Sequence, residues 1–296
     1  MDLPTQWSLK FWYNPKFQMK QFIGILLIFT ILLPLSSCNF GKKREVINND
    51  ANRESTSQNE MMNIQYIDKE LKLELDQLID KIGELGGSAY LTKLISSDKS
   101  TYSTFPRPDY LMPLQKAATL STIEAKYRAA VVYKADMMVA SLYKEPLTDY
   151  KQTIAHLLID INNPGFNINL NEAHRRSVRN VKKMVNELYN EAYKENRIDL
   201  FWEAAACGVI EELFLLSHNL DKIPVLLSDQ DIAVITKRLH IVIEGINKSI
   251  PIHPELSKVK GILKPISSLK AVNISQLQRY LTDNKENLSS VRDNLF

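Results

Sequence analysis

Apolar residues recur every three or four positions along most of the chain, which is the period of an α-helix. The clearest runs cover residues 67–82, 154–161, 178–192 and 232–246. No alternating run is long enough for a sheet strand, and nine glycines are few for a protein with many tight hairpins. We therefore expect an all-α fold, a single bundle of about seven to nine helices over residues 61–296.

Local signals place several helix ends. Gly86 follows the first apolar run and supplies a stop. Ser228 is suited to cap the helix that contains residues 232–246, and the last helix should begin after Asn273. In the proline-rich middle of the chain we expect regular helix to start near Pro113, because proline is tolerated in a first helical turn.

Residues 199–216 are apolar on nearly every side, so this helix should lie at the centre of the bundle. It nevertheless carries three glutamates. At 100° per residue, Glu203 and Glu211 point about 80° apart, and Glu212 points about 180° away from Glu203. They cannot all face water if the helix is central, and a buried carboxylate must be paired, hydrogen-bonded or protonated.

A second apolar segment, residues 134–143, contains Asp136. Two interpretations compete. Asp136 and Glu211 form a carboxylate pair for acid–base chemistry or for a metal, or these carboxylates bind basic or tyrosine side chains and fix how the helices pack. We favour the second, because buried ionic groups more often specify an arrangement than perform chemistry. The candidate buried structural residues are Asp136, Glu203, Glu211 and Glu212.

The two segments share residues with a known pattern: Ala135, Asp136, Ala140, Ser141, Leu142 and Tyr143, then Gly208, Ile210, Glu211, Leu213, Phe214 and Leu215. In these residues the chain resembles an uncharacterised family of helical periplasmic lipoproteins of Bacteroidota, over roughly residues 100–250. It departs from that family at Phe214, where tyrosine is usual, and in lacking a glycine near Tyr133. The resemblance implies a helical fold and an extracytoplasmic compartment, and no activity.

Aromatic residues and prolines gather in one predicted loop, at Tyr102, Phe105, Pro106, Pro108 and Tyr110. Prolines stiffen such a loop, and aromatic residues are enriched at interface hot spots. We therefore treat it as a candidate partner-binding loop. The alternative is that it folds over the bundle as a lid on the core, which is the more frequent role of such loops.

The N-terminal region reads as a bacterial lipoprotein signal. Residues 22–35 are apolar but too few to span a bilayer, which takes about 20. Small residues and then Cys38 follow, as in a lipobox, where the thiol is acylated and the signal is removed. We expect residues 1–37 to be a signal peptide and Cys38 to be lipidated.

Two further features belong to this region. A basic segment opens at Met19, so we expect the true start there, with residues 1–18 outside the protein. The alternative is a long signal peptide that includes these residues. Residues 38–60 are polar and have almost nothing to bury, so they should form a disordered tether behind the lipid anchor.

Composition narrows the class of partner. Without residues 1–37 the chain has 34 basic and 33 acidic residues, and no cluster of lysine or arginine calls for nucleic acid. Cys207 has no cysteine partner once Cys38 is lipidated, and its apolar surroundings are those of an inert thiol.

Familiar catalytic signatures are missing from the sequence. The five histidines show no i, i+4 pair, and no His-Glu-x-x-His, Gly-x-Ser-x-Gly or phosphate-binding glycine loop occurs. We accordingly assign no catalytic residue, no metal ligand and no cofactor from the sequence.

These patterns favour a non-enzymatic lipoprotein of the outer membrane, facing the periplasm and acting as an interaction or scaffold module within an envelope complex. Its partners would be the membrane, through the lipid on Cys38, and an envelope protein. The residues after Cys38 are basic rather than acidic, which favours the periplasmic side. The alternatives are a surface-exposed lipoprotein that binds a ligand or a host molecule, and an enzyme that uses buried carboxylates.

Overall fold

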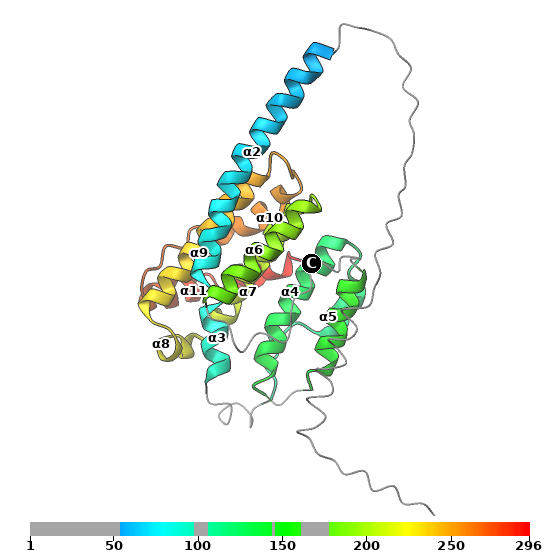
Figure 1. Cartoon of the computed structure of the whole chain (residues 1–296). Coiled ribbons are helices and arrows are strands. Elements are labelled where there is room, and N and C mark those ends of the chain that lie inside the picture. The colour runs from blue at the N-terminus through cyan, green and yellow to red at the C-terminus, as the bar shows by residue number, and fades with distance from the viewer. Residues whose placement is uncertain (1–53, 98–105, 144–145, 161–177) are drawn as a thin grey trace, which may run out of the picture. The chain divides into compact units, whose positions relative to one another are not determined.

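The computed structural model describes residues 54–97, 106–143, 146–160 and 178–296. The chain divides into two compact units, residues 1–56 and 57–296, and the account below concerns the second. Its α-helices are α2 (Glu54–Leu85), α3 (Ala89–Ser96), α4 (Ile123–Ala140), α5 (Thr148–Asp160), α6 (Val178–Lys194), α7 (Ile198–Ser217), α8 (Ile223–Leu226), α9 (Asp229–Ser249), α10 (Leu256–Leu263), α11 (Ile274–Asp283) and α12 (Lys285–Asp293) (Figure 1).

The predicted all-α class is confirmed. The described residues are 78% helical and contain no strand. They form eleven α-helices, more than the seven to nine expected, because α3, α8 and α10 have only eight, four and eight residues. Helix α2 begins at Glu54, before the expected start at Met61.

Several helix ends follow from the side chains that the sequence offers. The Ser228 side chain accepts a hydrogen bond from the backbone N–H of Asp231, and the Asp231 carboxylate accepts one from the backbone N–H of Ser228. Helix α9 therefore begins with a capping box. The side chain of Asn273 caps α11 by accepting a hydrogen bond from the backbone N–H of Gln276. The prediction that regular α-helix starts near Pro113 was wrong. Pro113 precedes a 3₁₀ helix, Leu114–Thr119 (η2), and the α-helix α4 starts only at Ile123.

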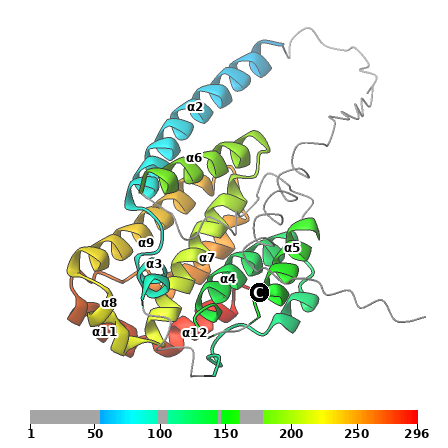
Figure 2. The same ribbon diagram turned by 60° about the horizontal axis from the view of Figure 1, so that its bottom comes forward.

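Helix α7 is the centre of this unit, as its apolar sequence predicts. It contacts α3, α4, α6, α9, α10, α11 and α12, and Figure 2 shows it between α4 and α9. Apart from Ala204, Ala205 and Gly208, all its residues are buried. Helix α9 comes closest at Gly245, where any added Cβ would overlap the ring of Trp202.

Within the residues that the structure describes, every helix is too short or too polar to cross a membrane.

Candidate functional site

The four carboxylates singled out in the sequence are all in the interior. Asp136, Glu203, Glu211 and Glu212 are each at most 2% exposed. Each contacts one of three buried arginines: Arg128, Arg238 and Arg292. The arginines come from α4, α9 and α12, so three ionic clusters connect α7 to distant parts of the chain.

The largest cluster joins α4, α7 and α12. The guanidinium of Arg292 donates to both oxygens of Glu211, from Nε at 2.7 Å and from Nη2 at 3.1 Å. The same Nη2 lies 3.3 and 3.2 Å from the two oxygens of Asp136. One guanidinium therefore bridges two carboxylates that the sequence separates by 75 positions along the chain.

The loop before η2 closes this cluster. The backbone N–H of Met112 donates to Asp136 at 2.8 Å, and the carbonyl oxygen of Tyr110 accepts from Arg292 at 3.3 Å. On another side the guanidinium carbon of Arg292 lies 4.2 Å from the ring centre of Phe214, a cation–π contact. These contacts satisfy donors and acceptors that would otherwise be costly to bury.

Two carboxylates face one guanidinium here, so protonation decides the charge. Burial, and then the neighbouring Glu211, raise the pKa of Asp136 well above its ordinary value, although Arg292 opposes the change. Burial also raises the pKa of Glu211, against the same arginine. Two carboxyls with raised pKa values beside one guanidinium favour a state in which they hold one proton between them, which leaves one negative charge for one positive charge.

The second cluster holds the end of the chain. Arg128 of α4 donates from Nη1 to Glu203 at 2.7 Å and from Nε to the carbonyl oxygen of Leu295. Burial raises the pKa of Glu203 to about 7, in spite of the lowering effect of Arg128. Near the same end, Lys116 lies 4.7 Å from the ring centre of Phe296.

The third cluster holds the turn between α2 and α3. Arg238 of α9 donates to Glu212 at 2.7 Å and to the carbonyl oxygens of Gly86 and Gly87 at 3.2 and 2.7 Å. Glu212 also accepts from the hydroxyl of Ser88 at 2.6 Å. The pair thus neutralises the carbonyl end of α2 and the start of α3 together.

Chemically, this arrangement holds helices together. The four carboxylates accept hydrogen bonds from arginine, backbone and serine donors and lie away from solvent, so a substrate would have to displace these bonds to reach them. The three arginines were not identified in the sequence, where they look like ordinary surface residues of amphipathic helices. A buried carboxylate requires a partner, but spacing along the chain does not reveal which of 37 basic residues it is.

The structure describes only part of the candidate partner-binding loop, and the described residues differ in their burial. Tyr102 and Phe105 lie outside the described residues. Pro106 is exposed and Pro108 half-buried, whereas Tyr110 packs against Phe214 and His218 and its hydroxyl accepts from Asn219 at 3.0 Å. The part around Tyr110 therefore serves as a lid, and burial raises the pKa of its hydroxyl to about 12.

The outer side of this loop borders a shallow pocket of about 310 Å³, lined by Arg107, Pro108, Asp109, Leu111, Pro113, Leu114 and Gln115. Asp136 and Glu211 do not line this pocket, so it gives no direct route to the carboxylate pair.

The structure describes one of the two cysteines. Cys207 is fully buried in α7, and burial raises the pKa of its thiol well above the ordinary value, as expected for an unreactive cysteine. Cys38 lies outside the described residues, so its lipidation stays a prediction.

Comparisons with protein-family models, with curated proteins and with solved structures found no match to this chain. The resemblance to the Bacteroidota lipoproteins therefore also stays a prediction.

Proposed function

We propose that this protein is a non-enzymatic lipoprotein, anchored to the outer membrane through Cys38 and facing the periplasm, where its helical body acts as an interaction or scaffold module. The sequence of residues 22–38 supports the anchor. Two or three acyl chains would hold almost irreversibly, since each buried methylene contributes about 0.8 kcal/mol.

The observation that carries the scaffold role is the pairing of the α7 carboxylates with arginines. The arginines that pair with these carboxylates also bind the carbonyl oxygens of Leu295 and of the α2–α3 turn, and one of them belongs to α12. The buried pairs therefore hold these segments in place. A body built in this way presents a fixed surface, which suits a protein that positions a partner.

Some apolar side chains on the body are exposed to solvent. Ile159 is 72% and Val225 81% exposed. Single exposed apolar residues are common, but they offer sites at which contact with an envelope protein can be tested by crosslinking.

The first experiment tests the anchor. Cells that express the full chain or its Cys38→Ser variant are labelled with a palmitate analogue, and membranes are separated from the periplasm. We expect label and membrane association in the wild type only, with Cys207→Ser behaving like the wild type. Label that persists in Cys38→Ser would contradict the assignment.

The second experiment tests the side of the membrane and the partner. In intact cells, added protease should leave the protein whole, and in permeabilised cells it should digest it. Digestion in intact cells would instead support the surface-exposed alternative. Crosslinking of the full-length lipidated protein should then capture one recurrent envelope protein, and repeated capture of none would count against the scaffold role.

A further inference from the structure

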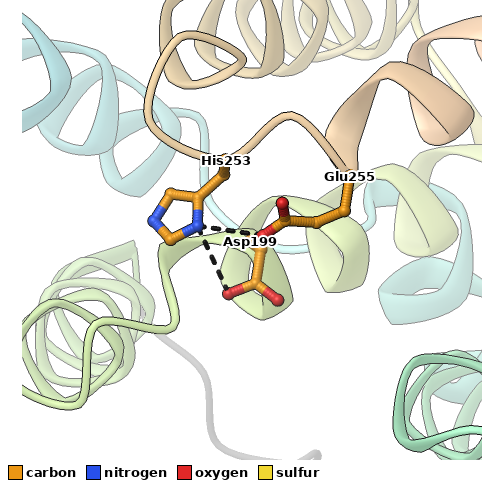
Figure 3. A group of neighbouring side chains, drawn as sticks. All are labelled: Asp199, His253 and Glu255. Carbon is orange, nitrogen blue, oxygen red and sulfur yellow. Dashed lines mark hydrogen bonds and ion pairs between the residues drawn. The ribbon is translucent and has the colours of Figure 1, made fainter.

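Three side chains with metal-ligating atoms converge near the start of α7, outside the clusters described above. Asp199 lies in the first turn of α7, His253 in the connection between α9 and α10, and Glu255 at the N-cap of α10. Figure 3 shows one nitrogen of the His253 ring directed at the two carboxylates. The close approach of α10 to α7 brings these residues together.

The distances suit a single ion. Nδ1 of His253 lies 3.0 Å from Glu255 Oε1 and 3.9 Å from Asp199 Oδ1, and the ligand atoms of all three lie within 4.8 Å of one another. A point equidistant from three atoms at such separations lies about 2.0–2.4 Å from each. Zinc binds imidazole nitrogen and carboxylate oxygen at about 2.0–2.2 Å. Small side-chain movements therefore suffice to form all three bonds.

Two of the three side chains are buried and the third is open to solvent. The side chains of Asp199 and His253 are only 5% and 7% exposed, whereas that of Glu255 is 49% exposed. Two ligands are thus held in the interior, and the third faces solvent, where an ion can enter and a water molecule can complete its coordination.

The backbone and neighbouring charges hold two of the ligands in position. The N–H of His253 donates to the carbonyl oxygen of Ser249 at 2.8 Å. Arg197 donates from Nε to Asp199 Oδ1 at 3.3 Å and from Nη2 to Oδ2 at 3.4 Å, so the guanidinium fixes the carboxylate with Oδ1 also facing His253. Metal-binding carboxylates are commonly held by such outer hydrogen bonds.

The local charge favours a cation. Glu124 lies 3.7 Å from Arg197, so three carboxylates surround one guanidinium and one imidazole. The carboxylates exceed the guanidinium by two negative charges, which a divalent ion balances.

The imidazole of His253 has polar contacts at only one of its two ring nitrogens, among the described residues. Buried polar atoms are nearly always hydrogen-bonded. The second ring nitrogen of His253, Nε2, is buried and has no hydrogen-bond partner among the described residues. The carboxylates at Nδ1 are therefore the polar contacts that orient this ring.

We propose that Asp199, His253 and Glu255 bind one divalent transition-metal ion, best matched by Zn²⁺, with a coordination position left open to solvent. One nitrogen and two oxygen donors favour zinc over Mg²⁺ or Ca²⁺, which prefer oxygen ligands alone. The site does not depend on the scaffold role or on the lipid anchor, and its test can fail while both stand.

The test is calorimetric titration of the tag-free full chain, purified in detergent and stripped with a chelator, with ZnCl₂. We expect one ion per chain with a dissociation constant tighter than about 10 µM, and no binding of MgCl₂ at the same concentrations. Replacement of Zn²⁺ by Co²⁺ should give a visible absorption band that reports nitrogen and oxygen coordination.

Glu255→Gln and His253→Gln should each weaken Zn²⁺ binding by at least about tenfold and remove the cobalt band. Glu244→Gln and His240→Gln are the matched controls, since both side chains are exposed on α9, and they should leave binding unchanged. Glu255 is half exposed, so its variant should fold even if the histidine variant does not, which circular dichroism will report. Absence of saturable Zn²⁺ binding, or equal binding in a folded Glu255→Gln chain, would overturn the proposal.

Discussion

Replacing Arg292 with methionine removes the single positive charge that serves two buried carboxyls. Arg292→Met keeps an unbranched apolar side chain about as long as the aliphatic stem of arginine. It removes four hydrogen bonds to Asp136 and Glu211 and the contact with the carbonyl oxygen of Tyr110. We expect a loss of about 3–5 kcal/mol in the free energy of unfolding near neutral pH, because the buried carboxylate must then stay unpaired or take up a proton at a cost.

The pH dependence of this loss is the sharper expectation. In the wild type, burial and Glu211 raise the pKa of Asp136, and we expect the two carboxyls to hold one proton between them. Arg292 lowers the pKa of Glu211, so without it we expect that pKa to rise further and the folded variant to bind one more proton than the wild type. A raised pKa contributes stability below the unfolded value near 4.5, and that contribution is lost as pH rises toward the folded value. The difference between the two proteins should therefore grow by up to about 1.4 kcal/mol for each pH unit above 5.

The assay is urea unfolding of the full chain followed by circular dichroism at pH 5 and pH 8. Arg279→Met is the control, since the Arg279 side chain is 87% exposed and its pair with Asp283 should contribute less than about 1 kcal/mol. Glu211→Gln should be milder than Arg292→Met, because Asp136 can then lose its proton and pair with Arg292. A cost for Arg292→Met that is equal at both pH values, or as small as that of Arg279→Met, would refute the shared-proton account.

Three further expectations concern other parts of the chain. Gly245→Ala should cost about 1–3 kcal/mol in the free energy of unfolding, because its Cβ would overlap the Trp202 ring. Gly261→Ala should be neutral or stabilising, because the added Cβ would meet no atom outside its own helix within 4 Å among the described residues. Equal melting temperatures of the two variants would contradict the close packing of α7 and α9. The stability of Glu203→Gln relative to the wild type should rise by about 2 kcal/mol between pH 5 and pH 8. The reason is that the pKa of Glu203 is raised to about 7, so the wild-type protein becomes less stable as pH rises through that range. A stability difference that is the same at both pH values would argue against this pKa. If Met19 is the true start, Met19→Ile should remove the protein band from immunoblots, and Met1→Ile should leave it unchanged. The reverse result would make residues 1–18 part of a longer signal peptide.

The period of the apolar residues was sufficient to predict the all-α class and the central place of α7. Both follow from local physics, since a helix that is apolar on all sides must be surrounded by others. Caps at Ser228 and Asn273 were equally readable, because the bonds that form them connect residues only three positions apart. Short helices such as α8, and the 3₁₀ turn after Pro113, depend on packing and were not predicted.

The requirement that the α7 carboxylates be neutralised was also present in the sequence, as a consequence of the cost of burying charge. Which groups neutralise them was decided only by tertiary structure: Arg128 lies 75 positions from Glu203, and Arg292 lies 81 positions from Glu211. The meeting of Asp199 with His253 and Glu255 has the same origin, since the packing of α10 on α7 alone makes it possible. Hydrophobic periodicity determines that helices form and which faces they bury, but contacts between distant side chains arise only when those faces have packed.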